Sequence, residues 1–130
     1  MLSITIKILP GELADRMSIA ALRARHLSEG DALRHAQNEL ADLRRNWASI
    51  PGQTPETARL AAELADVNRQ LWAVEDELRL CEQRSSFDAR FIELARSVYR
   101  LNDRRSQLKR EINVSLCAAP GEEKVYASRA

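Results

Sequence analysis

The stretch that decides the fold is Val67-Asn68-Arg69-Gln70-Leu71-Trp72-Ala73-Val74-Glu75-Asp76-Glu77-Leu78-Arg79. Apolar side chains recur through it, and beyond both of its ends, at alternating spacings of three and four residues: Leu64, Val67, Leu71, Val74, Leu78 and Cys81. This spacing lines them up on one face of a helix. The stretch therefore predicts a long helix with one buried face.

A second stripe of side chains runs beside the apolar one. Its members are Asn68, Trp72, Glu75 and Arg79, again at helical spacing. An amide, an indole, a carboxylate and a guanidinium in one line can form a ligand site. They can equally form a polar seam that fixes how two helices align. The pattern leaves both interpretations open.

Composition favours a mainly α protein with one domain over residues 1–130. Of the 130 residues, 30% are charged and 5% aromatic, with only four glycines and four prolines. A β-sandwich or an α/β enzyme normally contains more glycine and more aromatic residues. A formal net charge of +1 gives no reason to expect nucleic acid as a partner.

Membrane insertion is not expected either, because no stretch approaches the ~18 apolar residues that a membrane span needs. The two cysteines, Cys81 and Cys117, are too far apart for a Cys-x-x-Cys metal pair. A reducing, cytoplasmic location is the expectation.

Periodicity and helix-breaking residues predict four helices, at residues 12–27, 31–50, 55–82 and 88–116, followed by a C-terminal tail at 118–130. Residues 3–9 alternate between apolar and polar side chains, which predicts a short strand. Its partner could be the C-terminal residues 124–127, another subunit or nothing. We favour pairing with 124–127.

A short turn at residues 84–88 makes the last two helices antiparallel neighbours. The charges of the two helices favour this pairing. Residues 55–84 contain seven acidic residues against four arginines, and residues 90–110 contain seven basic residues against two acidic ones. The predicted architecture is thus four helices dominated by a long antiparallel hairpin. Arg105 interrupts the apolar face of the last helix.

Folding this hairpin about residue 85 brings Trp72 opposite Tyr99 and Asn68 opposite Asn102. The hypothetical ligand site is then a polar groove between the two helices, formed by Asn68, Trp72, Glu75, Arg79, Tyr99, Asn102 and Lys109. Further charge at its mouth could come from the first helix, through Glu12, Asp15, Arg16 and Arg25. In the alternative interpretation Glu75 pairs with Arg79 and Asn68 with Asn102, and the seam is structural.

Metal, cofactor and catalytic chemistry have little support in the sequence. Carboxylate pairs such as Glu12 and Asp15 lack the second convergent pair that Mg²⁺ needs. His26 and His35 have no third ligand in view, and neither cysteine has a neighbouring histidine. We therefore predict no catalytic residues, no metal and no cofactor.

Four segments carry a resemblance to a known family: residues 71–76, 95–105, 109–113 and 123–126, together with Gly11-Glu12-Leu13-Ala14-Asp15. Through them the chain resembles a bacterial family of short, mainly helical proteins of unknown function. The resemblance implies no activity and no catalytic residues.

The pattern as a whole favours a non-enzymatic helical interaction or scaffold protein. Its apolar stripes are longer than two short helices can cover, so we expect a homodimer with coiled-coil-like contacts along the exposed part of the hairpin. The alternative is a binder or enzyme for a small anionic metabolite, such as a sugar phosphate, that uses the polar groove.

Overall fold

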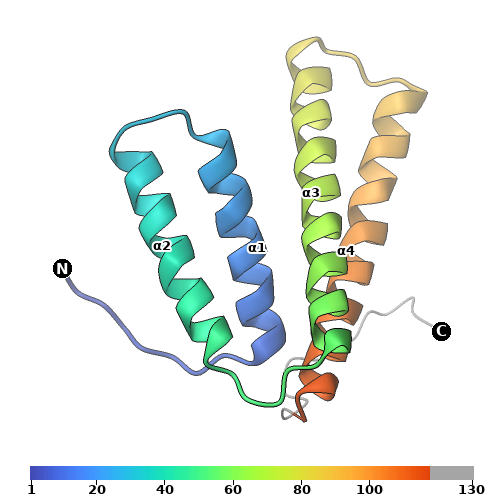
Figure 1. Ribbon diagram of the computed structural model, residues 1–130. Coiled ribbons are helices and arrows are strands. Elements are labelled where there is room, and N and C mark those ends of the chain that lie inside the picture. Colours follow the sequence, from blue (N-terminus) through green and yellow to red (C-terminus); the bar gives the residue numbers. More distant parts are fainter. Residues whose placement is uncertain (118–130) are drawn as a thin grey trace.

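The computed structural model describes residues 1–117, in which four helices make up the ordered body. They are α1 (Pro10–His26), α2 (Asp31–Ala48), α3 (Pro55–Gln83) and α4 (Ala89–Ser115). Figure 1 shows two helical hairpins side by side, α1 with α2 and the longer α3 with α4. Helix α1 is central, because it packs against each of the other three helices. The predicted mainly α architecture with a long antiparallel hairpin is confirmed.

The helix starts follow local capping chemistry. Helix α3 begins with a capping box, in which the side chains of Thr54 and Thr57 each accept a bond from the other residue's backbone N–H. In α4 the Asp88 carboxylate accepts from the backbone N–H groups of Arg90 and Phe91. Helix α1 begins at Pro10, earlier than predicted, because proline's fixed φ suits the first helical turn.

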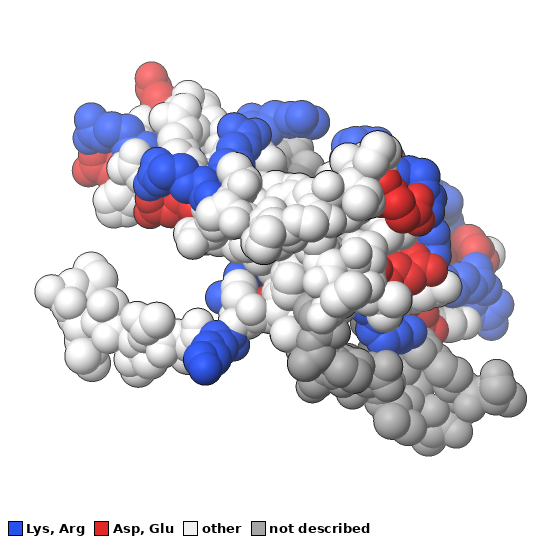
Figure 2. Space-filling model, turned by 60° about the horizontal axis from the view of Figure 1, so that its bottom comes forward, with Lys and Arg blue, Asp and Glu red and all other residues white. Residues whose placement is uncertain are grey.

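The predicted strand at residues 3–9 is wrong. No strand occurs anywhere in residues 1–117, and the first nine residues form an extended arm before α1 (Figure 1). Ile4 and Ile6 are 80% and 63% exposed, and Figure 2 shows the arm as a largely uncharged projection standing clear of the helices. Alternation alone does not make a strand, because its N–H and C=O groups need a neighbouring strand. The favoured partner, residues 124–127, lies outside the described residues.

The hydrophobic core lies at the end of the molecule where α1 and α3 begin and α4 ends. Leu64, Leu108 and Ile112 are completely buried there, and each such side chain contributes roughly 1.5–3 kcal/mol by leaving water. Towards the other end the predicted apolar stripe is only partly covered, since Leu71 and Leu78 remain half-buried. The reason is length: α1 has 17 residues and α3 has 29. No helix within residues 1–117 is both long and apolar enough to cross a membrane.

Gly11 allows the start of α1 to lie directly against α4. A Cβ at this position would sit 2.3 Å from the carbonyl oxygen of Lys109. The Gly11 backbone N–H also donates to Asn113 Oδ1 at 2.7 Å, and both residues are buried. This contact determines where α1 crosses the long hairpin, and so it determines the shape of the groove described next.

Candidate functional site: a groove between α1, α3 and α4

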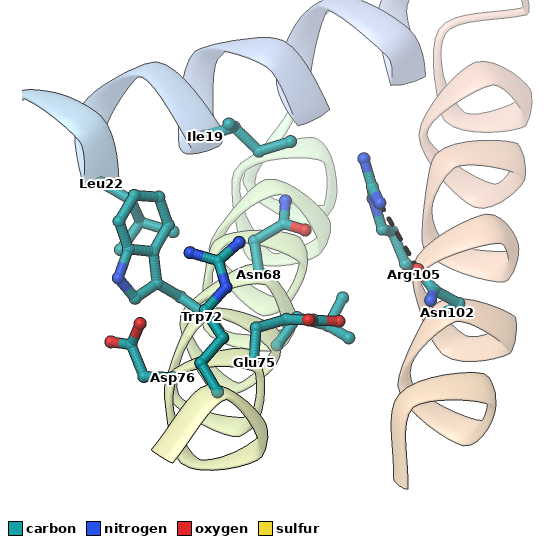
Figure 3. Close-up of a pocket in the computed structure, with 10 residues that line it drawn as sticks. Ile19, Leu22, Asn68, Trp72, Glu75, Asp76, Asn102 and Arg105 are labelled. Atoms are coloured by element: carbon teal, nitrogen blue, oxygen red, sulfur yellow. Dashed lines mark hydrogen bonds between the residues drawn. The ribbon is translucent and has the colours of Figure 1, made fainter. Parts of the chain in front are cut away.

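A groove of about 330 Å³ opens where α1, α3 and α4 meet, next to the core (Figure 3). The residues that line it are Ile19, Leu22, Asn68, Leu71, Trp72, Glu75, Asp76, Arg79, Asn102 and Arg105. Five of the seven residues predicted for a polar groove are among them: Asn68, Trp72, Glu75, Arg79 and Asn102. Tyr99 and Lys109 are not. The groove also includes two α1 side chains, Ile19 and Leu22, that the hairpin geometry did not predict.

Asn68 forms a buried part of the groove wall and bonds to α1. Its Nδ2 donates to Asp15 Oδ1 at 2.9 Å and to Ser18 Oγ at 2.6 Å. The predicted bond between Asn68 and Asn102 is therefore wrong. Helix α1 lies over this part of the hairpin and supplies the partners that α4 was expected to provide.

A bidentate ion pair between Asp15 and Arg105 joins α1 to α4 beside the groove. Arg105 Nε donates to Asp15 Oδ1 at 2.8 Å and Nη2 donates to Oδ2 at 2.6 Å. Asp15 is only 2% exposed, so this pair is shielded from water on the carboxylate side. The hydrogen bonding of Arg105 to the Asp15 carboxylate raises the pKa of Arg105, although burial opposes the rise. The interruption of the apolar face at Arg105 is thus a buried structural contact.

Sequence reasoning missed this pair, although two signals for it exist. Arg105 stands at a position of α4 where the helical spacing of apolar residues predicts another apolar residue. Two carboxylates, Glu12 and Asp15, stand three residues apart on α1 and so share a face. A cation on a buried face requires an opposite charge, and α1 is the helix that could supply it.

Lys109 belongs to the same α1–α4 seam and not to the groove. Its Nζ lies 2.5 Å from Glu12 Oε2, and Arg16 Nε donates to Glu12 Oε1 at 2.9 Å. Partial burial would raise the pKa of Glu12, but the bonds and charges of Lys109 and Arg16 outweigh it and hold this pKa below its ordinary value of 4.5. Lys109 is therefore already paired with a carboxylate of the protein, that of Glu12.

The aromatic wall of the groove is Trp72, which stacks on His26, the last residue of α1. The ring centroids are 4.6 Å apart with an angle of 10° between the planes. The predicted contact between Trp72 and Tyr99 is wrong, because Tyr99 points outward on α4 and its ring centre lies 5.8 Å from the Arg100 guanidinium. Tyr99 instead borders an adjoining hollow along α4 of about 480 Å³, which Lys109 also lines and which shares Asn102 and Arg105 with the groove.

Three charged side chains stand around the opening of the groove: Glu75, Asp76 and Arg79. None of them forms an ion pair with another residue in the described range, 1–117. The predicted pairing of Glu75 with Arg79 is therefore absent from this part of the chain. Figure 3 shows Glu75 directed across the groove toward Asn102 and Arg105, and Asp76 on the side of Trp72.

Asp76 and Arg79 differ from other acidic and arginine residues that stand three positions apart on a helix of this protein, including two such pairs on α3 itself. In four cases an acidic residue closes onto an arginine three positions later: Asp31–Arg34, Asp42–Arg45, Glu56–Arg59 and Asp66–Arg69. Glu93 has Arg96 at that spacing but binds Arg100 instead. Asp76 and Arg79 have the same spacing, yet neither has an ion-pair partner among residues 1–117.

The groove offers hydrogen-bonding groups, charges and apolar surface. Within residues 1–117, no three His, Cys, Asp or Glu side chains converge in a way that could hold a metal ion. Both cysteines are free thiols, Cys81 near the turn of the α3–α4 hairpin and Cys117 just after α4.

Comparison with known proteins assigns a family. The chain belongs to a family of unknown function (DUF6165), whose sequence model matches residues 4–128. The resemblance found in the sequence is thereby confirmed as membership of a family of unknown function. No curated protein and no solved structure matches the chain.

Proposed function

We propose that this member of the family binds a small polar molecule in the groove between α1, α3 and α4. The observation that carries the proposal is a set of charges, Glu75, Asp76 and Arg79, that have no ion-pair partner within residues 1–117 and that line the groove together with aliphatic side chains. Charged groups beside apolar surface that have no protein partner can gain more from a ligand than charges already bridged within the protein.

The walls of the groove support the proposal because they are held in place before any ligand binds. Asn68 and Arg105 are both fastened to Asp15, and Trp72 is stacked on His26. A preorganised site loses less entropy on binding. The volume of about 330 Å³ lies at the lower end of the range for small-molecule sites. At roughly 30 Å³ per water-sized group, it holds a ligand of about ten non-hydrogen atoms.

A thermal-shift screen of the purified chain tests the proposal. The screen covers phosphorylated sugars, carboxylic acids, amino acids and amines, and we expect at least one class to raise Tm. A ligand at a hundred times its Kd adds about 2.7 kcal/mol to the stability of the folded state. The variants Arg79→Ala and Trp72→Ala should lose the shift, because each removes a group that lines the groove.

The matched control is Arg96→Ala, which removes an exposed α4 arginine that has no ion pair in residues 1–117. It should respond to ligand like the wild type. A screen without a hit, or hits that bind the Trp72→Ala variant equally well, would contradict binding in this groove.

A second candidate function, self-association as a helical interaction protein, rests on the turn end of the α3–α4 hairpin. Leu80, Phe87 and Ile92 are large apolar side chains that stand about half exposed there. Phe87 packs edge to face against Phe91, with centroids 5.1 Å apart, so the cluster is ordered. This end extends past α1, and a second copy of the hairpin could cover it in a homodimer.

Sedimentation of the purified chain over a range of concentrations tests self-association. We expect a dimer whose population rises with concentration. The double variant Phe87→Ser, Ile92→Ser should shift the equilibrium about ten-fold or more toward monomer, because it removes two large apolar side chains that the dimer would bury. Ile4→Ser, on the exposed arm, is the control and should leave the dimer intact. A strict monomer at every concentration would exclude this candidate.

A further inference from the structure

We infer that the ligand of the groove is a free amino acid with an aliphatic or aromatic side chain. The inference rests on the proposed function and adds the class of ligand. It differs from the anionic metabolite that the sequence pattern suggested, and the difference comes from the balance of charges that the structure brings together around the opening.

The charges that line the groove are not predominantly positive. Two guanidinium groups line it, but Arg105 is already neutralised by the buried Asp15 carboxylate. The charges without a protein partner among residues 1–117 are then one cation, Arg79, and two anions, Glu75 and Asp76. A sugar phosphate would bring a further negative charge beside two carboxylates. A molecule that has both an ammonium and a carboxylate complements both signs.

The spacing of Glu75 and Arg79 on α3 suits a ligand in which two oppositely charged groups are attached to the same carbon. Glu75 and Arg79 are four residues apart, so their side chains start about 5–6 Å from one another on the same helix face. The ammonium group of an amino acid can donate to Glu75 or Asp76. Its carboxylate can at the same time accept from the Arg79 guanidinium, in the geometry that arginine forms with carboxylates.

The rest of the groove suits an apolar side chain. Ile19, Leu22 and Leu71 present aliphatic surface, and Trp72 presents an indole that is stacked on His26. Room for about ten non-hydrogen atoms corresponds to molecules of the size of leucine or phenylalanine. The apolar part of the ligand would lie against these residues, and its charged end would point to the opening.

Titration with L-phenylalanine and L-leucine tests the inference. Two blocked compounds accompany them, N-acetyl-L-phenylalanine without the ammonium charge and L-phenylalaninamide without the carboxylate. The readouts are calorimetry on the wild-type chain and fluorescence of a Trp47→Phe variant, in which Trp72 is the remaining one of two tryptophans. We expect the free amino acids to bind, and each blocked form to bind about ten-fold or more weakly, because one charge-assisted hydrogen bond is lost.

Two variants test which side chains of the groove bind the carboxylate of the ligand and which bind its ammonium group. Arg79→Gln should reduce the preference for phenylalanine over its amide. The double variant Glu75→Gln, Asp76→Asn should reduce the preference over the N-acetyl compound. Glu82→Gln on α3 and Arg96→Gln on α4 remove exposed charges that do not line the groove and should change neither preference.

The outcomes separate this inference from the proposed function. If sugar phosphates or N-acetylated acids bind more tightly than the free amino acids, and Arg79→Gln abolishes their binding, the groove is a site but the ligand class is wrong. The ligand class is equally wrong if the amide binds as well as the free amino acid. If neither these probes nor the wider screen binds, the proposed function fails together with the inference.

Discussion

The Gly11→Ala variant is expected to lower the free energy of unfolding by at least about 2 kcal/mol. The added methyl carbon would lie 2.3 Å from the Lys109 carbonyl oxygen and 2.9 Å from both its carbonyl carbon and its Cα. These are backbone atoms of α4, which cannot rotate away as a side chain would, so α1 has to shift. That shift would also weaken the buried bond from the Gly11 N–H to Asn113.

Urea unfolding of the wild type and the variant measures the effect. The sign of the change in the free energy of unfolding is informative, because helix propensity alone predicts that alanine stabilises a helical position by about 1 kcal/mol relative to glycine. The control is Gly30→Ala, where φ is +93° and no atom lies within 4 Å of the added carbon. At φ +93° and ψ −169° a residue with a Cβ pays roughly 1–3 kcal/mol for its backbone conformation, so any loss there reflects backbone strain without a close contact. A Gly11→Ala variant as stable as the wild type would contradict the close contact between α1 and α4.

The Arg105→Ala variant is expected to cost about 3–5 kcal/mol, the range for a buried ion pair that loses one partner. Asp15 is 2% exposed and would keep a buried charge, with the Asn68 amide as its remaining side-chain donor. Asp15→Ala should cost somewhat less, because the side chain of Arg105 is 30% exposed and can turn toward water. In a double-mutant cycle the two losses should not add, since the second change removes a charge that the first has left unpaired.

The neighbouring arginine provides the matched control. Arg104, also on α4, pairs with Glu63 of α3, but that pair is about 40% exposed on both sides. Arg104→Ala should therefore cost no more than about 1 kcal/mol. Thermal unfolding measures the same difference, because a change of 1 kcal/mol in the free energy of unfolding shifts Tm by roughly 4 °C for a chain of this size. If the two arginine variants were equally stable, the Asp15–Arg105 pair would not be the buried contact described above.

These two sites connect the stability of the fold to the groove. Gly11 and Arg105 both hold α1 against α4, and α1 supplies Ile19 and Leu22 to the groove. The same contacts that determine the position of α1 therefore determine the shape of the candidate site. This explains why only five of the seven residues predicted from the α3–α4 hairpin line this groove.

Several features of the protein follow from the sequence by itself. The four helices do, because apolar spacing and capping residues such as Thr54 and Asp88 act over a few neighbouring positions. The antiparallel hairpin follows from a short turn between two long helices. The shared face of Asn68, Trp72, Glu75 and Arg79 follows from helical geometry, and these four residues do line one groove.

Only the tertiary structure decided how those faces are used. The Asp15–Arg105 bond joins residues 90 positions apart, and no local pattern specifies which helix will cover Arg105. The alternation at residues 3–9 resembles a strand, yet a strand exists only where another supplies its hydrogen bonds. The sequence by itself determined which side chains share a helix face. The position of α1 over the long hairpin decided which of them are buried in a structural network and which have no ion-pair partner within residues 1–117, because burial and pairing depend on neighbours that are distant in the chain.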